Sequence, residues 1–322
     1  MEAHTRTTAA IAGIFLPLIT PFRDGALDES SLVRLATHYG RSRIDGLILA
    51  ATTGEGLTLD EEETERLVAT VAATVDTDLP IYLGLCGSDT RKMLHRLEAT
   101  DGWPIAGYLI ACPYYSRPSQ QGLFEHFAAL AGRTEKPILL YNIPYRTGIN
   151  LVNETLFRLA ALPNIVGVKD CCADAGQAFD LLRGRPAGFS VLTGEDALFF
   201  NAIAHGADGG ILASAHVDPA AFADLREMLM RGDRDGALRR WSSLVDLVRL
   251  LFAEPSPAPI KHWLWRTGLI GSPELRLPMT SVSPALSERL DRALAAHRPA
   301  GCATRMGEAP QAPPQRPAGV PS

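Results

Sequence analysis

The sequence has no long hydrophobic run and no excess of positive charge. No apolar stretch reaches the roughly 18 residues that a membrane-spanning helix needs. The first residues, MEAHTRTTAAIAG, lack the basic segment and the long apolar segment of a secretory signal. The net charge of −5 provides no positive field for nucleic acid or anionic lipid. We therefore expect a cytoplasmic protein with no membrane or nucleic-acid partner.

Cysteines are few and irregularly spaced. The chain has five, and they form neither a C-x-x-C pair nor an even disulfide framework. This pattern is typical of free thiols in a reducing compartment. The ligand spacing of a zinc site is also missing, so we expect no metal.

Lysine is scarce as well: there are four lysines against 27 arginines, namely Lys92, Lys136, Lys169 and Lys261. Lys169 ends an apolar run, where a charged amine is poorly solvated and its pKa should fall. A neutral amine can attack a ketone or aldehyde and form a Schiff base, whereas arginine stays protonated. The alternative is an ion pair with Asp170 or Asp196. For Lys261, outside the strand pattern, we expect a structural contact.

Apolar strands alternate with amphipathic helices along residues 13–220. The strands are continuously apolar, as in a parallel sheet that is buried on both faces. Eight such units in about 220 residues predict a (β/α)₈ TIM barrel; the rival, a doubly wound sheet, lacks a G-x-G-x-x-G after the first strand. The predicted strands are residues 13–20, 46–52, 80–86, 107–113, 137–143, 165–170, 189–194 and 208–214.

The remaining segments read differently. Residues 1–12 form an N-terminal arm, and residues 221–297 predict a helical C-terminal extension without strands. Residues 298–322 are rich in Pro, Ala and Gly, and we expect a disordered tail there. Within the barrel, Asp28 or Ser30 is expected to cap one helix. Thr58 and Glu61 are expected to form the capping box of the next.

Hydroxyl and cationic side chains gather where the strands end. Barrel enzymes use these carboxyl ends for catalysis. Tyrosine and threonine hydroxyls there could relay protons, or the tyrosines could simply pack at the rim. Arg146 could bind a substrate carboxylate through two hydrogen bonds, or could make a surface ion pair. The residues concerned are Thr52, Thr53, Tyr114, Tyr115, Tyr141 and Arg146.

Six stretches together resemble the dihydrodipicolinate synthase / N-acetylneuraminate lyase family. They are ATTGEGLTL, CPYYSRPSQQGLFEHF, YNIPYRTGINL, VGVKD, LTGEDA and LRLPMT, and EPSPAPIK resembles a further stretch of the synthases. The resemblance spans about Gly13 to Thr280. It implies a class I aldolase-type lyase on a (β/α)₈ barrel that uses pyruvate and needs no metal or organic cofactor.

The resemblance also implies roles for residues of this chain. Lys169 condenses with pyruvate, Tyr141 passes protons, and Thr52 and Tyr115 complete the hydroxyl relay. The residue matching Tyr115 reaches in from a neighbouring subunit in the family, which implies a homo-oligomer, expected to be a dimer of dimers. Four residues match positions that bind substrate: Thr53 at the pyruvate carboxylate, Arg146 at the aldehyde's carboxylate, and Gly194 and Ile211 through their backbone.

Arg146 favours the synthase branch, in which pyruvate condenses with aspartate 4-semialdehyde. Three departures leave alternatives open. Asp170-Cys171-Cys172-Ala173 stands where Glu-Ala-Thr/Ser-Gly is typical, Tyr145 replaces a small residue, and the lysine-effector positions are changed, with only Tyr114 retained. The rivals are another pyruvate-dependent aldolase, dehydratase or deaminase, acting on a sugar acid or a hydroxyproline-derived compound, and a non-catalytic keto-acid-binding barrel. We expect little feedback inhibition by lysine, from the changes at Gly56, Leu57, Glu61, Thr64, Ser88 and Lys92.

Overall fold

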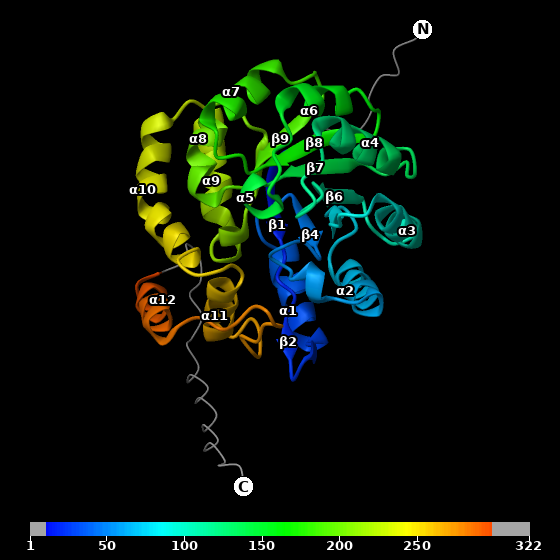
Figure 1. Cartoon of the computed structure of the whole chain (residues 1–322). Coiled ribbons are helices and arrows are strands. Elements are labelled where there is room, and N and C mark those ends of the chain that lie inside the picture. The colour runs from blue at the N-terminus through cyan, green and yellow to red at the C-terminus, as the bar shows by residue number, and fades with distance from the viewer. Residues whose placement is uncertain (1–10, 298–322) are drawn as a thin grey trace.

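Eight parallel strands close into a barrel in the computed structural model, which describes residues 11–297 (Figure 1). The strand order around the barrel is β1-β10-β9-β8-β7-β6-β5-β4. This closed parallel sheet confirms the predicted (β/α)₈ barrel and excludes the doubly wound rival. The strands are β1 (Gly13–Pro17), β4 (Gly46–Leu49), β5 (Ile81–Leu85), β6 (Gly107–Ala111), β7 (Ile138–Asn142), β8 (Ile165–Asp170), β9 (Ser190–Thr193) and β10 (Gly209–Ile211).

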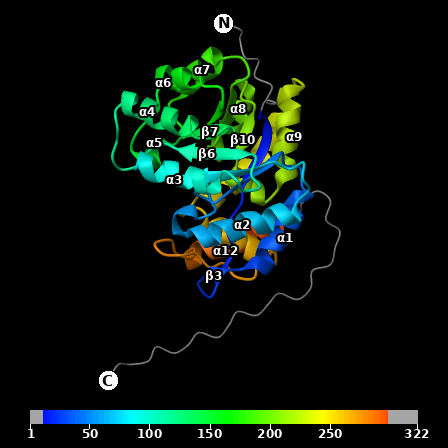
Figure 2. The same cartoon turned by 90° about the vertical axis from the view of Figure 1, so that its right-hand side faces the viewer.

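Helices surround the barrel on its outside, as the two views at right angles show (Figures 1 and 2). The helices between and after the strands are α1 (Glu29–Gly40), α2 (Glu61–Thr74), α3 (Thr90–Thr100), α4 (Gln120–Ala131), α5 (Pro144–Thr147), α6 (Asn153–Leu159), α7 (Ala175–Gly184), α8 (Phe199–Ala204) and α9 (Pro219–Met230). Short 3₁₀ helices follow three strands: η1 (Gly56–Thr58), η2 (Asp196–Leu198) and η3 (Ala213–His216). No helix within residues 11–297 is both long enough and apolar enough to cross a bilayer.

Residues 221–297 contain most of α9 and three further helices, α10 (Arg234–Leu251), α11 (Ala258–Arg266) and α12 (Pro284–Ala296). They contain no strand, apart from one isolated bridge between Phe22 and Glu274. The predicted disordered tail and nearly all of the predicted N-terminal arm lie outside the described residues.

The apolar strands are buried on both faces, which explains their unbroken hydrophobic sequence. One core fills the space between the strands and the helices, and a second fills the barrel interior. The inner core is made largely of residues from the strands, among them Phe15, Ile48, Tyr82, Leu109, Leu139, Tyr141, Leu192 and Ile211.

Two local details differ from the sequence-based expectations. The capping box of α2 is formed by Asp60 and Glu63 rather than by Thr58 and Glu61, because the chain first makes the 3₁₀ turn η1. Both pairs have the same spacing, so the sequence pattern alone did not separate them. A hairpin of β2 (Phe22–Arg23) and β3 (Ala26–Leu27) was not predicted, since each strand has only two residues. Asp28 caps α1, as one of the two expected choices.

Candidate active site

Lys169 lies near the carboxyl end of β8, inside the barrel. Its side chain is only 6% exposed. Across the β7–β8 ladder its partner is Tyr141, and the Lys169 Nζ atom lies 4.3 Å from the centroid of the Tyr141 ring. The parallel register therefore brings together the two residues that the sequence marked as amine and proton carrier.

Gly194 provides the space that the Lys169 side chain occupies. It directly follows β9, and its backbone N–H donates to the carbonyl oxygen of Asp170 at 2.8 Å. A Cβ atom at this position would lie 2.3 Å from Cε of Lys169 and 2.4 Å from Sγ of Cys171. Any side chain at position 194 would displace the amine, so this position needs glycine.

Burial lowers the pKa of Lys169 below its usual value of 10.5, because the charged amine loses its hydration. Within residues 11–297 no carboxylate forms an ion pair with it. The Asp170 carboxylate accepts from the backbone N–H of Cys172 at 3.2 Å, and that of Asp196 accepts from Ser214 N at 2.6 Å. The alternative in which Lys169 pairs with Asp170 or Asp196 is therefore not what the structure contains.

Tyr141 is as buried as Lys169, at 6% exposure. Burial raises the pKa of its phenol well above 10, so the hydroxyl keeps its proton at neutral pH. Tyr141 and Cys171 belong to the same inner core. Tyr141 can therefore donate a proton from an apolar setting, beside the amine of Lys169.

The helix α5, directly after β7, carries Tyr145 and Arg146 at the entrance. Pro144 starts this single turn, and Gly148 ends it in the left-handed conformation with φ of 76°. Both side chains are exposed, and the guanidinium carbon of Arg146 lies 5.7 Å from the Tyr145 ring centroid. No carboxylate of the described chain pairs with Arg146, so the surface ion pair considered above is not formed. Its guanidinium is available to an acidic ligand.

The other predicted residues are more spread out. Thr53 is buried after β4, and Ile211 is fully buried at the end of β10. Thr52 has an exposed side chain, and Tyr115 is 93% exposed with a strained φ of 70°. A single chain thus brings Lys169, Tyr141 and Gly194 together but leaves the Tyr115 ring in solvent.

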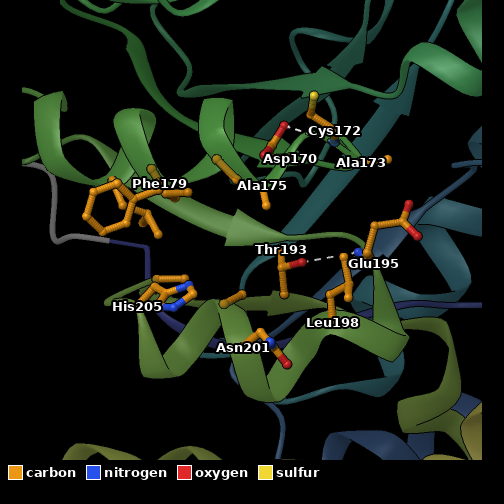
Figure 3. Close-up of a pocket in the computed structure, with 15 residues that line it drawn as sticks. Asp170, Cys172, Ala173, Ala175, Phe179, Thr193, Glu195, Leu198, Asn201 and His205 are labelled. Atoms are coloured by element: carbon orange, nitrogen blue, oxygen red, sulfur yellow. Dashed lines mark hydrogen bonds between the residues drawn. The ribbon is translucent and has the colours of Figure 1, made fainter.

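The two adjacent cysteines have different surroundings. Cys171 is buried beside Lys169 and Gly194 in the inner core. Cys172 lines an apolar groove between α7 and α8, together with Phe179, Thr193 and His205 (Figure 3). The sequence analysis did not distinguish the two cysteines. A usable signal was present, because side chains alternate along a strand, so residue 171 is expected on the same face as residue 169. No group of three metal-ligating side chains occurs in the described part of the chain.

Comparison with known proteins agrees with this architecture. Residues 10–297 match the model of the Dihydrodipicolinate synthetase family. The chain is 44% identical over 284 residues to 4-hydroxy-tetrahydrodipicolinate synthase 2 of Clostridium acetobutylicum, covering 88% of this chain and 99% of that protein. It is 36% identical over 289 residues to 4-hydroxy-tetrahydrodipicolinate synthase of Phenylobacterium zucineum, covering 90% and 97%.

Solved structures give the same result. The 4-hydroxy-tetrahydrodipicolinate synthase of Methylacidiphilum fumariolicum SolV superposes with a TM-score of 0.85 at 36% identity, covering 88% of this chain and 95% of that one. A structure described as the first monomeric dihydrodipicolinate synthase variant superposes with a TM-score of 0.86 at 33% identity, covering 88% and 96%.

Proposed function

Because the chain belongs to the Dihydrodipicolinate synthetase family, whose members are lyases of the class I aldolase type, we propose that it is a 4-hydroxy-tetrahydrodipicolinate synthase. It would condense pyruvate with aspartate 4-semialdehyde. The observation that carries this proposal is a buried lysine that forms no ion pair with a carboxylate, at a barrel strand end and against the ring of a buried tyrosine.

The proposed reaction starts at the Lys169 amine. In its neutral form the nitrogen attacks the keto carbon of pyruvate, water leaves, and a protonated imine forms. Loss of a proton from the pyruvate methyl group gives an enamine, whose carbon attacks the aldehyde. We assign the proton transfers to the hydroxyl of Tyr141, whose ring lies against the Lys169 amine and whose raised pKa keeps the phenol protonated. The amino group of the adduct then displaces Lys169 and closes the ring.

Substrate binding is assigned to the residues around this pair. Thr53 and the backbone of Gly194 and Ile211 would bind pyruvate, and the unpaired Arg146 would bind the carboxylate of the semialdehyde. Thr52 and Tyr115 would complete the relay. The nearly full exposure of Tyr115 in one chain supports a homo-oligomer in which its ring enters a neighbouring site, and we propose a dimer of dimers. The four described cysteines are free, which supports a reducing, cytoplasmic location.

Two separate assays test the imine and the second substrate. The chain is incubated with pyruvate and borohydride, and the reduced adduct is located by mass spectrometry. We expect the adduct on Lys169 and, without reductant, turnover with aspartate 4-semialdehyde. Turnover only with a sugar acid or a hydroxyproline-derived compound would replace the proposal with the rival lyase, dehydratase or deaminase. A bound keto acid with no turnover of any of them would favour a non-catalytic barrel.

The pH dependence of imine formation tests the state of the amine. Burial lowers the pKa of Lys169, so the neutral amine should predominate from a pH below 10.5 upward. We expect the initial rate of pyruvate trapping by cyanoborohydride to rise with pH and to reach its plateau below the pH range in which an ordinary lysine titrates. Far-UV circular dichroism over the same range controls for unfolding. A trapping rate that still rises steeply near pH 10.5, as expected for a lysine with an ordinary pKa, would contradict this expectation.

A further inference from the structure

A second buried lysine, Lys261 on α11, lies in a charge cluster apart from the pair of Lys169 and Tyr141. Its side chain is fully buried and forms an ion pair with Glu55, whose side chain is also buried. The Lys261 Nζ atom donates to the carbonyl oxygen of Glu274 at 2.8 Å and lies 4.3 Å from the centroid of the Phe22 ring. The structural contact predicted for Lys261 is confirmed, and its partner is a loop of the barrel.

Arg276 contacts the same loop, through the Glu55 carboxylate oxygen that Lys261 does not contact. Its backbone N–H donates to Oε2 of Glu55 at 3.0 Å. Its guanidinium donates to the carbonyl oxygen of Thr58 at 2.8 Å and forms a bidentate pair with Glu63 at the start of α2. The stretches EPSPAPIK and LRLPMT therefore meet on ATTGEGLTL, through side chains that the proposed chemistry does not use.

Glu55 forms the turn that follows Thr52 and Thr53. Its backbone N–H donates to the carbonyl oxygen of Thr52 at 3.1 Å, and that of Gly56 donates to Ala51 at 3.1 Å. Glu55 itself has φ of 51°, a left-handed conformation that is unfavourable for a residue with a side chain. Such a conformation persists only where surrounding contacts hold it. Here it is held by the backbone hydrogen bonds of the turn and by the buried carboxylate of Glu55, which ties the turn to Lys261 and Arg276.

We propose that Lys261 is a positioning residue for the pyruvate site: by pairing with Glu55 it holds the turn that carries Thr52 and Thr53, the threonines assigned above to pyruvate and to the proton relay. This inference rests on the proposed binding of pyruvate at Lys169. The C-terminal helical region thereby contributes to substrate binding without touching the substrate. A buried carboxylate that loses its cationic partner is strongly destabilised, so Glu55 would move towards water and release the turn.

Replacement of Lys261 by methionine keeps most of the length of the side chain and removes its charge. We expect the pyruvate concentration for half-maximal trapping at Lys169 to rise by about ten- to a hundredfold, the scale set by misplacement of binding groups by about 1 Å. The trapped fraction at saturating pyruvate, and the KM for aspartate 4-semialdehyde, should change little. Glu55→Gln removes the same ion pair from the other side and should give the same rise in the pyruvate concentration. It provides a second test of the proposal if Lys261→Met does not fold.

The double variant Lys261→Met/Glu55→Gln separates positioning from simple stability. It leaves no unpaired charge in the interior, so its melting temperature should recover relative to Lys261→Met. The pyruvate concentration for half-maximal trapping should stay high, because the turn has lost the ion pair between Lys261 and Glu55. Lys136→Met is the matched control: the Lys136 amine donates to the carbonyl oxygens of Trp103 and Ile105 at the opposite end of the barrel. It should lower stability without raising the pyruvate requirement.

The outcomes are distinguishable. The positioning role would be overturned if both single variants kept the native pyruvate concentration for half-maximal trapping, or if Lys136→Met raised it equally. Trapping in the native chain would in either case still uphold the proposed function. No trapping in the native chain would overturn the proposed function and this inference with it.

Discussion

Replacing Lys169 with arginine is expected to abolish pyruvate trapping and to lower kcat/KM by roughly 10⁴-fold or more, the scale of loss when a covalent nucleophile is removed. Arginine keeps the positive charge and much of the length, but its guanidinium does not lose a proton at any working pH. The buried amine of Lys169 does so more readily than an exposed lysine, because burial lowers its pKa. The substitution thus removes the imine chemistry while retaining the charge.

Trapping with borohydride and peptide mapping gives the direct measurement, and steady-state kinetics with aspartate 4-semialdehyde gives the rate. Lys92→Arg is the matched control, because it makes the same change at an exposed position on α3. It should leave both measurements within about twofold of the native values, as surface changes usually do. If Lys169→Arg retains trapping on another lysine, the amine has been assigned to the wrong residue.

The position of Lys169 was predictable from one local feature of the sequence, an unbroken apolar strand that ends in one of the few lysines. The register then follows from the barrel, since parallel pairing of β7 and β8 places Tyr141 opposite Lys169. The need for glycine at position 194 was not predictable from spacing, because it depends on where the Lys169 chain bends in space. The sequence marked Gly194 only through its resemblance to a family position.

Contacts that join distant segments were the hardest to predict. Glu55 and Lys261 each look unremarkable alone, and only the fold brings a left-handed turn after β4 against α11. The same applies to Cys171 and Cys172, whose adjacent thiols face the inner core and the α7–α8 groove respectively. Local sequence patterns were enough to predict the strands, the helices and the reactive lysine. The residues that surround this lysine could be identified only from the three-dimensional structure.

Tyr141→Phe is expected to lower kcat by about 10²–10⁴, the usual loss when a general acid–base group is removed. Phenylalanine keeps the ring that lies 4.3 Å from the Lys169 Nζ atom and keeps the packing of the inner core. Only the hydroxyl is lost, so the pKa of the amine should change little while proton transfer slows. Pyruvate should still be trapped on Lys169, but more slowly.

Tyr82→Phe provides the control for this change. Tyr82 lies on β5 in the same inner core, at 5% exposure, and its ring packs edge-on against Phe15. Removing its hydroxyl makes the same chemical change in the same apolar setting, and kcat should stay within about threefold of native, since it deletes no acid–base group. If Tyr141→Phe retained kcat within tenfold, or if the two variants lost activity equally, Tyr141 would contribute packing rather than proton transfer. The relay would then have to be assigned to another hydroxyl, and Thr52 would be the next to test.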